Sequence, residues 1–339
     1  MIYADIIQNN CKFHSPVSWW PRFAFHYTDV QNAVSILDSG YLYSRQIAED
    51  SNVMKNDNAS RQVIKMTNPT VKSYVRFYFR PLTPTQFHNE GFKHPQVRFQ
   101  GDANANVPMP VFFLFDLEKV LQMKDTQFSE TEQAGYGAVI CSTISEFEKF
   151  EFQKIYSIGP MSGREMIKYR QAEILYPHCF AVRPYLKAIL CRNNIERTTF
   201  LQLLKDKNKK NYNCYKDIVS VRQDDLFENN GLYVTNCQYN DNTVSISYSD
   251  TLAKKSYTRK YGSEPLTPIP ARAEFEWLNN QSSIMMQFCN YQIDYKKSTG
   301  TIFKLGKPPV SADVLAVRLY IDNVLMCNVR HWVKDTIIF

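Results

Sequence analysis

The sequence predicts an α+β protein whose C-terminal region is rich in β-strands. Before residue 227, helical patterns alternate with short apolar runs, a mixture that favours helices packed on a sheet. After residue 227, polar and apolar residues alternate in short blocks that Asn, Asp, Gly and Pro interrupt, as in a β-sandwich. The 339 residues suffice for two domains. We therefore expect one domain at residues 1–226 and a β-rich domain at residues 227–339.

The clearest helix is expected at residues 28–40, where the sequence reads TDVQNAVSILDSG. Thr28 or Asp29 supplies a side-chain oxygen that accepts a hydrogen bond from a free backbone N–H of the first turn. Aliphatic side chains then recur at i, i+4 and i+7 and form one apolar face. Gly40 follows the last turn, where a left-handed residue ends many helices. Further helices are expected at residues 117–123 and 196–207.

The most regular strand of the first domain is expected at residues 74–80, YVRFYFR, which alternates with a period of two. Its apolar face carries Val75, Phe77 and Phe79, and its polar face carries Tyr74, Arg76, Tyr78 and Arg80. Other strands of this domain are expected at residues 111–116 and 170–176. In the C-terminal region, strands are expected at residues 231–237, 243–249, 273–278, 285–295, 302–305 and 314–329.

Composition and charge bound the class of protein. A hydrophobic fraction of 44% is ordinary for a globular chain and excludes wholesale disorder. The net charge of +7 is compatible with a polyanionic partner. No apolar stretch of about 18 residues suggests a membrane span, and the start of the chain lacks a signal-peptide pattern. The eight cysteines are widely spaced without a CxxC pair, which predicts reduced thiols in the cytoplasm and argues against a zinc site.

One predicted strand carries a carboxylate beside a carboxamide. In RQAEILY, Gln171 and Glu173 lie two residues apart and therefore on one face of a strand. A carboxylate there suits chemistry at a ribose, because it accepts a hydroxyl hydrogen bond and stabilises the positive charge that develops as a glycosidic bond breaks. The amide is suited to contact an incoming acceptor. The alternative is that Glu173 forms a surface salt bridge, for example with Arg170.

A histidine precedes the first predicted helix. His26 stands two residues before Thr28, so both side chains are expected near the helix N-terminus. One hypothesis is that they bind a nucleotide there, because free backbone N–H groups attract phosphate. The alternative is that His26 packs against the chain or caps the helix.

Taken together, these segments resemble the DarT family of toxins, ADP-ribosyltransferases that use NAD⁺ to modify bases of single-stranded DNA. The family opens with His-x-Thr and a helix with Asn and Ile-Leu-x-x-Gly, here His26, Thr28, Asn32, Ile36, Leu37 and Gly40. Its Tyr-Val-Pro-Phe-Tyr-Phe strand, followed by Pro-x-Ser-Pro-Met, corresponds to residues 74–79 and 81–85. Its Gln-Ala-Glu motif corresponds to residues 171–173. The resemblance spans roughly residues 20–190 and implies an ADP-ribosyltransferase-like split β-sandwich with flanking helices.

The resemblance also implies a role for each matching residue. Glu173 would be the catalytic glutamate, holding the nicotinamide ribose in a cleft between two small sheets. Arg61, which stands 13 residues before Tyr74, is the candidate for the catalytic arginine that the family carries upstream of this strand. The residues expected to bind NAD⁺ are His26, Thr28 and Asn32, together with Tyr74, Phe77 and Tyr78, which would lie in or behind the nicotinamide pocket. No metal is expected, because the cationic nicotinamide is already a good leaving group.

Two positions depart from the family pattern and bear on the pocket and on the acceptor base: Arg76 replaces Pro, and Thr85 replaces Met. Residues 61–80 carry five cations and no acid, interleaved with aromatic residues. Such a segment suits a single strand, because cations neutralise phosphates and aromatic faces stack on unpaired bases. We therefore expect Arg76 and Arg80 to contact nucleic acid. The alternative is a solvated basic face above an aromatic core.

The acceptor is expected to meet the segment that precedes Glu173, because in ADP-ribosyltransferases that loop usually chooses the acceptor. The predicted nucleic-acid contacts in this part of the chain are Tyr136, Lys154, Tyr156, Arg164, Lys168, Tyr169 and Gln171. The resemblance favours single-stranded DNA, and RNA is the closest alternative, because a groove for single strands can accept both. A non-enzymatic nucleic-acid-binding protein with an inactive transferase domain is the second alternative, and a protein-modifying transferase is the third.

The resemblance to a toxin family further implies a neutralising antitoxin and a place in a toxin–antitoxin or phage-defence system. Residues 227–339 would bind that partner or help to select the target.

Overall fold

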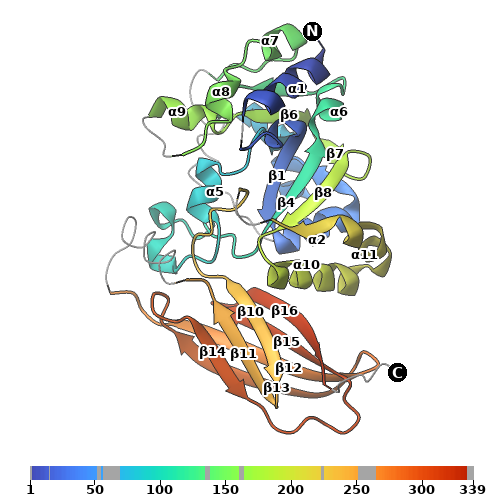
Figure 1. Cartoon of the computed structure of the whole chain (residues 1–339), viewed down its shortest axis with the longest axis vertical. Coiled ribbons are helices and arrows are strands. Elements are labelled where there is room, and N and C mark those ends of the chain that lie inside the picture. Colours follow the sequence, from blue (N-terminus) through green and yellow to red (C-terminus); the bar gives the residue numbers. More distant parts are fainter. Residues whose placement is uncertain are drawn as a thin grey trace.

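A seven-stranded sheet forms the centre of the N-terminal region in the computed structural model of the chain (Figure 1). The structure describes residues 2–14, 16–51, 55, 69–133, 138–159, 164–222, 225–250 and 265–333. The sheet has the order β5-β6-β3-β1-β4-β8-β9, and only the β8–β9 pair is parallel. A two-stranded sheet, β2-β7, accompanies it. The predicted mixture of helices and buried strands is confirmed.

The strands of this region are β1 (Phe23–Asp29), β2 (Tyr41–Tyr43), β3 (Tyr74–Tyr78), β4 (Pro110–Asp116), β5 (Gln127–Ser129), β6 (Glu173–Pro177), β7 (Cys179–Ala181), β8 (Leu186–Cys191) and β9 (Val219–Val221). The α-helices are α1 (Tyr3–Phe13), α2 (Val30–Ser39), α3 (Arg45–Asp50), α5 (Pro84–Asn89), α6 (Leu117–Leu121), α7 (Ile144–Phe147), α8 (Phe152–Ile155), α9 (Arg164–Tyr169), α10 (Asn194–Lys207) and α11 (Lys209–Tyr215). The 3₁₀ helices are η1 (Trp20–Arg22), η2 (Pro69–Ser73), η3 (Pro95–Val97), η4 (Phe99–Gly101) and η5 (Lys216–Ile218).

Helix α2 forms where the sequence predicts it. The Asp29 carboxylate accepts a hydrogen bond from the backbone N–H of Gln31 at 2.9 Å, so Asp29 rather than Thr28 caps the helix. Gly40 ends it with a φ of 78°, in the left-handed region that costs glycine little. Ala33, Val34 and Leu37 are buried in the core of the N-terminal region. Because β1 runs directly into this helix, the residues at the end of β1 meet its first turn.

Aromatic residues fill the core behind β3. The ring centroids of Phe77, Phe115 and Phe180 lie 4.9–5.3 Å apart, in edge-on arrangements that aromatic pairs favour. All three side chains are fully buried. Strand β3 therefore presents one face to this core and leaves its other face, with Tyr74, Arg76 and Tyr78, for the site described below.

The C-terminal region is a sandwich of two sheets. Its strands are β10 (Val234–Asn240), β11 (Thr243–Tyr248), β12 (Ile269–Asn279), β13 (Ser282–Ile293), β14 (Gly300–Lys304), β15 (Val314–Ile321) and β16 (Val324–Trp332). One sheet has the order β10-β11-β14 and the other β13-β12-β15-β16. The two sheets share one apolar core, in which the Phe275 and Phe303 rings lie 5.2 Å apart. The predicted β-rich region is confirmed.

One predicted strand proves to be two. The run at residues 314–329 is a hairpin, because Asp322 and Asn323 have φ values of 50° and 61° and turn the chain between β15 and β16. Asp and Asn tolerate these left-handed angles better than most residues, and two such residues in succession make a tight hairpin turn. The strand expected at residues 170–176 also differs, since it begins only at Glu173.

The N-terminal region and the sandwich are joined by packing contacts as well as by the chain that connects them. Phe92, from the N-terminal region, packs in the core of the sandwich, and its carbonyl accepts a hydrogen bond from the Tyr295 hydroxyl at 3.1 Å. Helix α10 lies between the seven-stranded sheet and the sandwich (Figure 1). Phe227 packs in the first core and Leu232 in the second. The expected domain boundary at residues 226–227 remains a prediction.

Among the described residues, no helix is long and apolar enough to span a membrane. In the same part of the chain, no three His, Cys, Asp or Glu side chains converge as metal ligands would. All eight cysteines are free thiols.

Candidate active site

A cavity of about 480 Å³ opens where β1 and β3 of the seven-stranded sheet approach β2, α2, α3 and α5. Its size is within the range of small-molecule and cofactor sites. Strands of both sheets line the cavity, β1 and β3 of the seven-stranded sheet and β2 of the two-stranded sheet, so it lies between sheets as expected. The polar and aromatic residues that line it are His26, Tyr27, Thr28, Asn32, Ser35, Asp38, Ser39, Tyr41, Tyr43, Arg45, Tyr74, Arg76, Tyr78, Thr83, Thr85 and Asn89.

His26 is held in one orientation at the floor of this cavity. Its Nδ1 donates a hydrogen bond to the backbone carbonyl of Arg76 at 3.2 Å, since a carbonyl only accepts. Its ring also stacks on Phe113. Desolvation lowers the pKa of His26 to about 4, although the bond to Arg76 opposes the shift. His26 is thus a neutral imidazole near pH 7, and its Nε2 remains a hydrogen-bond acceptor.

Thr28 and Asn32 lie beside His26 on the cavity wall. His26 and Thr28 belong to β1, two residues apart on one face, rather than to a loop before the helix. Asn32 is in the first turn of α2, and its Oδ1 accepts a hydrogen bond from the backbone N–H of Lys55 at 2.9 Å. The structure therefore brings together the three residues predicted from the first motif.

Glu173 forms an ion pair with Arg76 across two neighbouring strands. Tyr78 of β3 lies opposite Glu173 of β6, which makes Arg76 the diagonal neighbour of Glu173 on the same face. The guanidinium donates from Nε to Oε2 at 2.8 Å and from Nη2 to Oε1. Burial alone would lower the pKa of Arg76, but the carboxylate more than offsets this and raises it. The alternative of a surface salt bridge with Arg170 is wrong, because Glu173 is buried and Arg170 instead binds Ser157 and Gly159.

A polar cluster lies next to this ion pair. Gln171 precedes β6 in a turn, and its amide donates to Glu132 and accepts from the Thr85 hydroxyl at 3.4 Å. The Tyr78 phenol bonds to Thr85, and its pKa is raised by burial, so it is neutral near pH 7. Gln171, Tyr78 and Thr85, the residue that replaces Met of the family pattern, therefore form one hydrogen-bonded group. Glu132 is a member that no sequence motif indicated.

Phe77 does not face the cavity. It is fully buried on the core side of β3, and its ring centroid lies 6.2 Å from that of His26 in an edge-on arrangement. Of the two positions considered for it, lining the pocket or lying behind it, the structure supports the second. Tyr74 and Tyr78 do line the cavity.

Arg80 and Tyr156 are structural residues, contrary to the expectation that they contact nucleic acid. The Arg80 side chain is 1% exposed, lies over the Trp20 ring and donates to the carbonyls of Pro81, Ile155 and Ser157. Burial lowers its pKa to about 9. Tyr156 is buried as well, parallel to the Phe152 ring. The reason is that β3 ends at Tyr78, so the alternation that placed Arg80 on the polar face no longer applies.

Lys154 and Lys168 form a small cationic patch with an aromatic ring. Their ammonium groups lie 4.8 Å and 5.4 Å from the ring centroid of Tyr169. The two lysines come from α8 and α9, so the tertiary structure brings them together. The candidate catalytic residue Arg61, the predicted contact Tyr136 and the side chain of the predicted contact Arg164 lie outside the described residues.

Sequence reasoning missed one wall of the cavity. Tyr41 and Tyr43 of β2 line it with their rings 6.1 Å apart, and Arg45 follows at the start of α3. The segment YLYSR alternates aromatic and aliphatic residues before an N-cap serine and a cation, a signal that indicates a short strand leading into a helix. Arg45 pairs with Glu49 at 2.6 Å.

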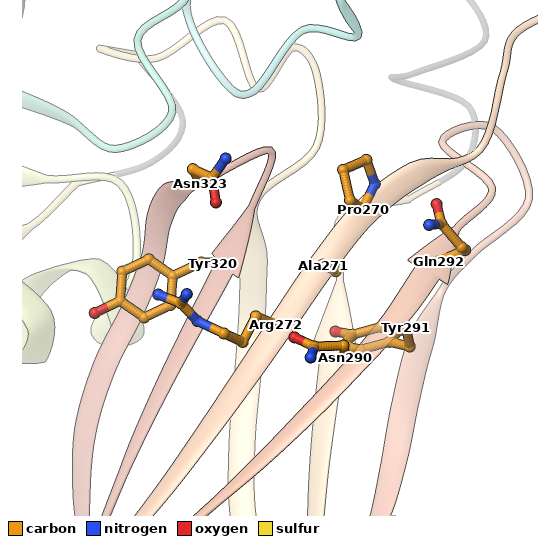
Figure 2. A pocket seen from close by; sticks show the side chains of 8 residues that line it. All are labelled: Pro270, Ala271, Arg272, Asn290, Tyr291, Gln292, Tyr320 and Asn323. Atoms are coloured by element: carbon orange, nitrogen blue, oxygen red, sulfur yellow. The ribbon is translucent and has the colours of Figure 1, made fainter.

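A second hollow, of about 350 Å³, lies on the outer face of the four-stranded sheet (Figure 2). The Arg272 guanidinium lies over the Tyr320 ring, 4.7 Å from its centroid, and Asn290, Gln292 and Asn323 also line the hollow. None of the residues predicted for the site lines this hollow. It is therefore separate from the cavity that contains His26 and Arg76.

Comparison with known protein families matches the part of the chain that contains the cavity residues. The sequence profile described as "ssDNA thymidine ADP-ribosyltransferase, DarT" matches residues 25–219, more than half of the chain. A structure of Thermus sp. 2.9 DarT in complex with carba-NAD⁺ has 16% identity and a TM-score of 0.46, covering 61% of this chain and 98% of that chain. For the same protein in complex with ADP-ribosylated ssDNA, the identity is 16%, the TM-score 0.49 and the coverage 60% and 95%.

Thermosipho africanus DarTG in complex with ADP-ribose has 16% identity and a TM-score of 0.45, covering 60% of this chain and 50% of that chain. None of the curated protein sequences compared matches the chain.

Proposed function

The chain belongs to the DarT family of ssDNA thymidine ADP-ribosyltransferases, and from this we propose that it transfers ADP-ribose from NAD⁺ to a base of single-stranded DNA with Glu173 as its catalytic carboxylate. The observation that carries the assignment is the position of Glu173. It is buried on β6, next to a cavity that His26, Thr28 and Tyr78 line, and these residues come from all three sequence motifs.

Binding of NAD⁺ is proposed to use the cavity from end to end. His26 and Thr28 form hydrogen bonds with the nucleotide beside the first turn of α2. Arg45 supplies a cation for the pyrophosphate, and Tyr74 and Tyr78 flank the nicotinamide. Because His26 stays neutral above about pH 4, it contributes acceptor capacity without a charge that would oppose the cationic nicotinamide.

Transfer then proceeds through bond breaking at the nicotinamide ribose. The bond between C1′ and the nicotinamide nitrogen breaks, and nicotinamide leaves with the electron pair as a neutral molecule. The Glu173 carboxylate stabilises the oxocarbenium ion electrostatically and holds a ribose hydroxyl. A nitrogen of the acceptor base forms a bond to C1′ and loses its proton to solvent. The base must be unpaired, because a stacked and paired base cannot reach the carbon.

The acceptor strand is proposed to lie across Lys154, Lys168 and Tyr169. Two ammonium groups beside an aromatic ring are the combination that single-strand sites use for phosphates and for stacking. Gln171, in the turn before β6, is placed to contact the base. Thymidine is the expected acceptor, because it is the nucleoside that the family description names.

A role as a toxin with a neutralising antitoxin is proposed from the family resemblance. Modified bases in single-stranded DNA would block replication, so a cell that carries this enzyme needs an inhibitor or an enzyme that removes the mark. Induced expression of the wild type should arrest growth, and the Glu173→Ala variant should not. Equal growth of the two strains, with equal amounts of protein, would contradict the toxin role.

The enzymatic proposal is tested with labelled NAD⁺ and four mixed-sequence oligonucleotides: single-stranded DNA, duplex DNA, single-stranded RNA and duplex RNA. We expect label on single-stranded DNA with the wild type and none with Glu173→Ala. Label on RNA alone would make RNA the acceptor. Label on the polypeptide instead would favour a protein-modifying transferase. Salt-dependent binding without label or nicotinamide release would favour a non-enzymatic nucleic-acid-binding protein.

A further inference from the structure

Arg76 stands between the proposed catalytic carboxylate and the cavity. Arg76 lines the cavity, whereas Glu173 does not. The Arg76 side chain is 30% exposed and that of Glu173 is 2% exposed. Both carboxylate oxygens accept from the guanidinium, one from Nε and one from Nη2. The guanidinium, not the carboxylate, therefore forms this part of the cavity wall.

This arrangement opposes cleavage of NAD⁺. A carboxylate with both oxygens paired to arginine has less capacity to accept a hydrogen bond from a ribose hydroxyl. The guanidinium also puts a positive charge at the place where the oxocarbenium ion develops its own positive charge, and like charges at close range repel strongly in a site shielded from water. For Glu173 to act, Arg76 must exchange the carboxylate for another anion.

A phosphodiester is the anion best suited to that exchange. The planar fork of a guanidinium binds a phosphate with the same pair of parallel hydrogen bonds that it makes with a carboxylate, so the exchange replaces each bond that it breaks. Arg76 is exposed enough to reach such a group, and it neighbours Tyr78, which Thr85 links to Gln171. An arginine at this place in β3 thus connects the proposed acceptor side of the site with the carboxylate.

We propose that Arg76 is a latch on Glu173 which a phosphate of the bound acceptor strand releases, so that NAD⁺ is cleaved only when a strand is present. This inference rests on the proposed transferase function. Without a strand, the latch suppresses the wasteful reaction in which the C1′–nicotinamide bond breaks, water adds its oxygen to C1′, and a proton is lost to solvent. With a strand, the arginine holds the phosphate and the freed carboxylate stabilises the ribose cation.

The test measures nicotinamide release from NAD⁺ in the absence of any nucleic acid. We expect a slow rate for the wild type and a rate about 10²–10³-fold faster for Arg76→Gln, the range over which removal of one electrostatic contact changes a rate. Arg76→Lys should fall between the two, because lysine keeps the charge but not the paired hydrogen bonds. Arg222→Gln is the matched control. It breaks another two-bond pair of an arginine with a carboxylate, that of Arg222 with Asp225 at 2.7 Å, away from the cavity.

A second measurement uses the unmodified protein. An abasic oligonucleotide supplies phosphates but no acceptor base, so it should increase nicotinamide release by the wild type while water takes the ADP-ribose. It should have little effect on Arg76→Gln, whose latch is already absent. Because it uses the wild-type protein, this measurement still tests the proposal if Arg76→Gln does not fold.

Two outcomes would overturn the latch: an unchanged or slower rate for Arg76→Gln, or no response of the wild type to the abasic strand. A wild-type rate that is already fast and equals that of Arg76→Gln would mean that the pyrophosphate of NAD⁺ itself displaces Arg76. If the wild type neither modifies DNA nor releases nicotinamide under any condition, the proposed function fails instead. Transfer to DNA with either of the two overturning outcomes would leave that function intact and remove only the latch.

Discussion

Two clusters of arginine and glutamate in the N-terminal region use the same ion pair in different surroundings. Arg76 and Glu173 stand at the cavity, and Arg76 reaches solvent. Arg192, Glu196 and Glu90 are sealed in the interior, with side chains 0–2% exposed. The comparison separates a pair that is free to change partner from a pair that holds two parts of the chain together.

The sealed cluster owes its stability to many partners. The Glu90 carboxylate accepts hydrogen bonds from the backbone of Glu228 and Asn229, at 2.9 Å and 2.8 Å, and from Gln86 at 2.7 Å. The Arg192 guanidinium donates to Glu196 and to the carbonyl of Pro108. Because these contacts fasten the segment that leads into the sandwich, the charges have a structural purpose. At the cavity, by contrast, Arg76 is the partner that covers Glu173.

Loss of Arg192 should produce the largest change. Arg192→Met leaves the carboxylates of Glu90 and Glu196 buried without their cation, and such a change usually costs about 3–5 kcal/mol of the free energy of unfolding. Arg76→Met should cost less, because water in the cavity reaches the carboxylate that is left. Urea denaturation measures both. Equal losses would show that the two clusters do not differ in the way described.

Glu173→Gln should affect activity more than stability. The amide keeps the shape of the side chain but loses the charge that we propose stabilises the ribose cation, and we expect transfer to fall by about 10²–10³-fold. The free energy of unfolding should change less than in Arg192→Met. Single-turnover transfer to single-stranded DNA and urea denaturation are the two measurements. A variant that unfolds as readily as Arg192→Met but keeps its specific activity would make Glu173 structural.

The neutral His26 should make the protein less stable in acid. The unfolded chain takes up a proton at its ordinary pKa of about 6.5, whereas the folded protein does so only near pH 4. Stability is therefore fully present above pH 6.5 and falls as the pH drops from 6.5 toward 4, by about 3 kcal/mol at most. His26→Gln should flatten this part of the curve. The unfolding free energies of the two proteins, compared at each pH, isolate His26 from the other histidines, and parallel curves would contradict the prediction.

The smallest expected effect concerns the patch of Lys154, Lys168 and Tyr169. Removing both lysines should weaken binding of single-stranded DNA and reduce the slope of log K against log salt by about 1.4, since each phosphate contact to a single strand contributes about 0.7. Fluorescence anisotropy over a salt series measures this. The double variant Lys119→Ala/Lys187→Ala removes the same charge elsewhere and should leave the slope unchanged. If both double variants reduce the slope equally, Lys154 and Lys168 do not form a specific binding site for the strand.

Local sequence determined the elements and the faces that carry the site. The cap at Asp29 and the glycine at Gly40 define α2 because they satisfy or end backbone hydrogen bonds within a few residues. The alternation of β3 predicted that Tyr74, Arg76 and Tyr78 share a face and that Phe77 lies on the other. The Gln-Ala-Glu segment likewise indicated Glu173. These features depend on neighbours in the sequence, so a pattern is enough to find them.

Only the tertiary structure decided which of these residues meet. The pairing of Arg76 with Glu173 joins residues 97 positions apart, and it exists because β3 and β6 are neighbours in the sheet. Because β3 ends at Tyr78, Arg80 lies in the interior and not on the polar face of the strand. Tyr41 and Tyr43 line the cavity because β2 lies beside it. Phe92 packs in the core of the sandwich, against residues that are distant from it in the sequence. Strand order and the burial of apolar surface depend on the whole chain, and no local pattern records them.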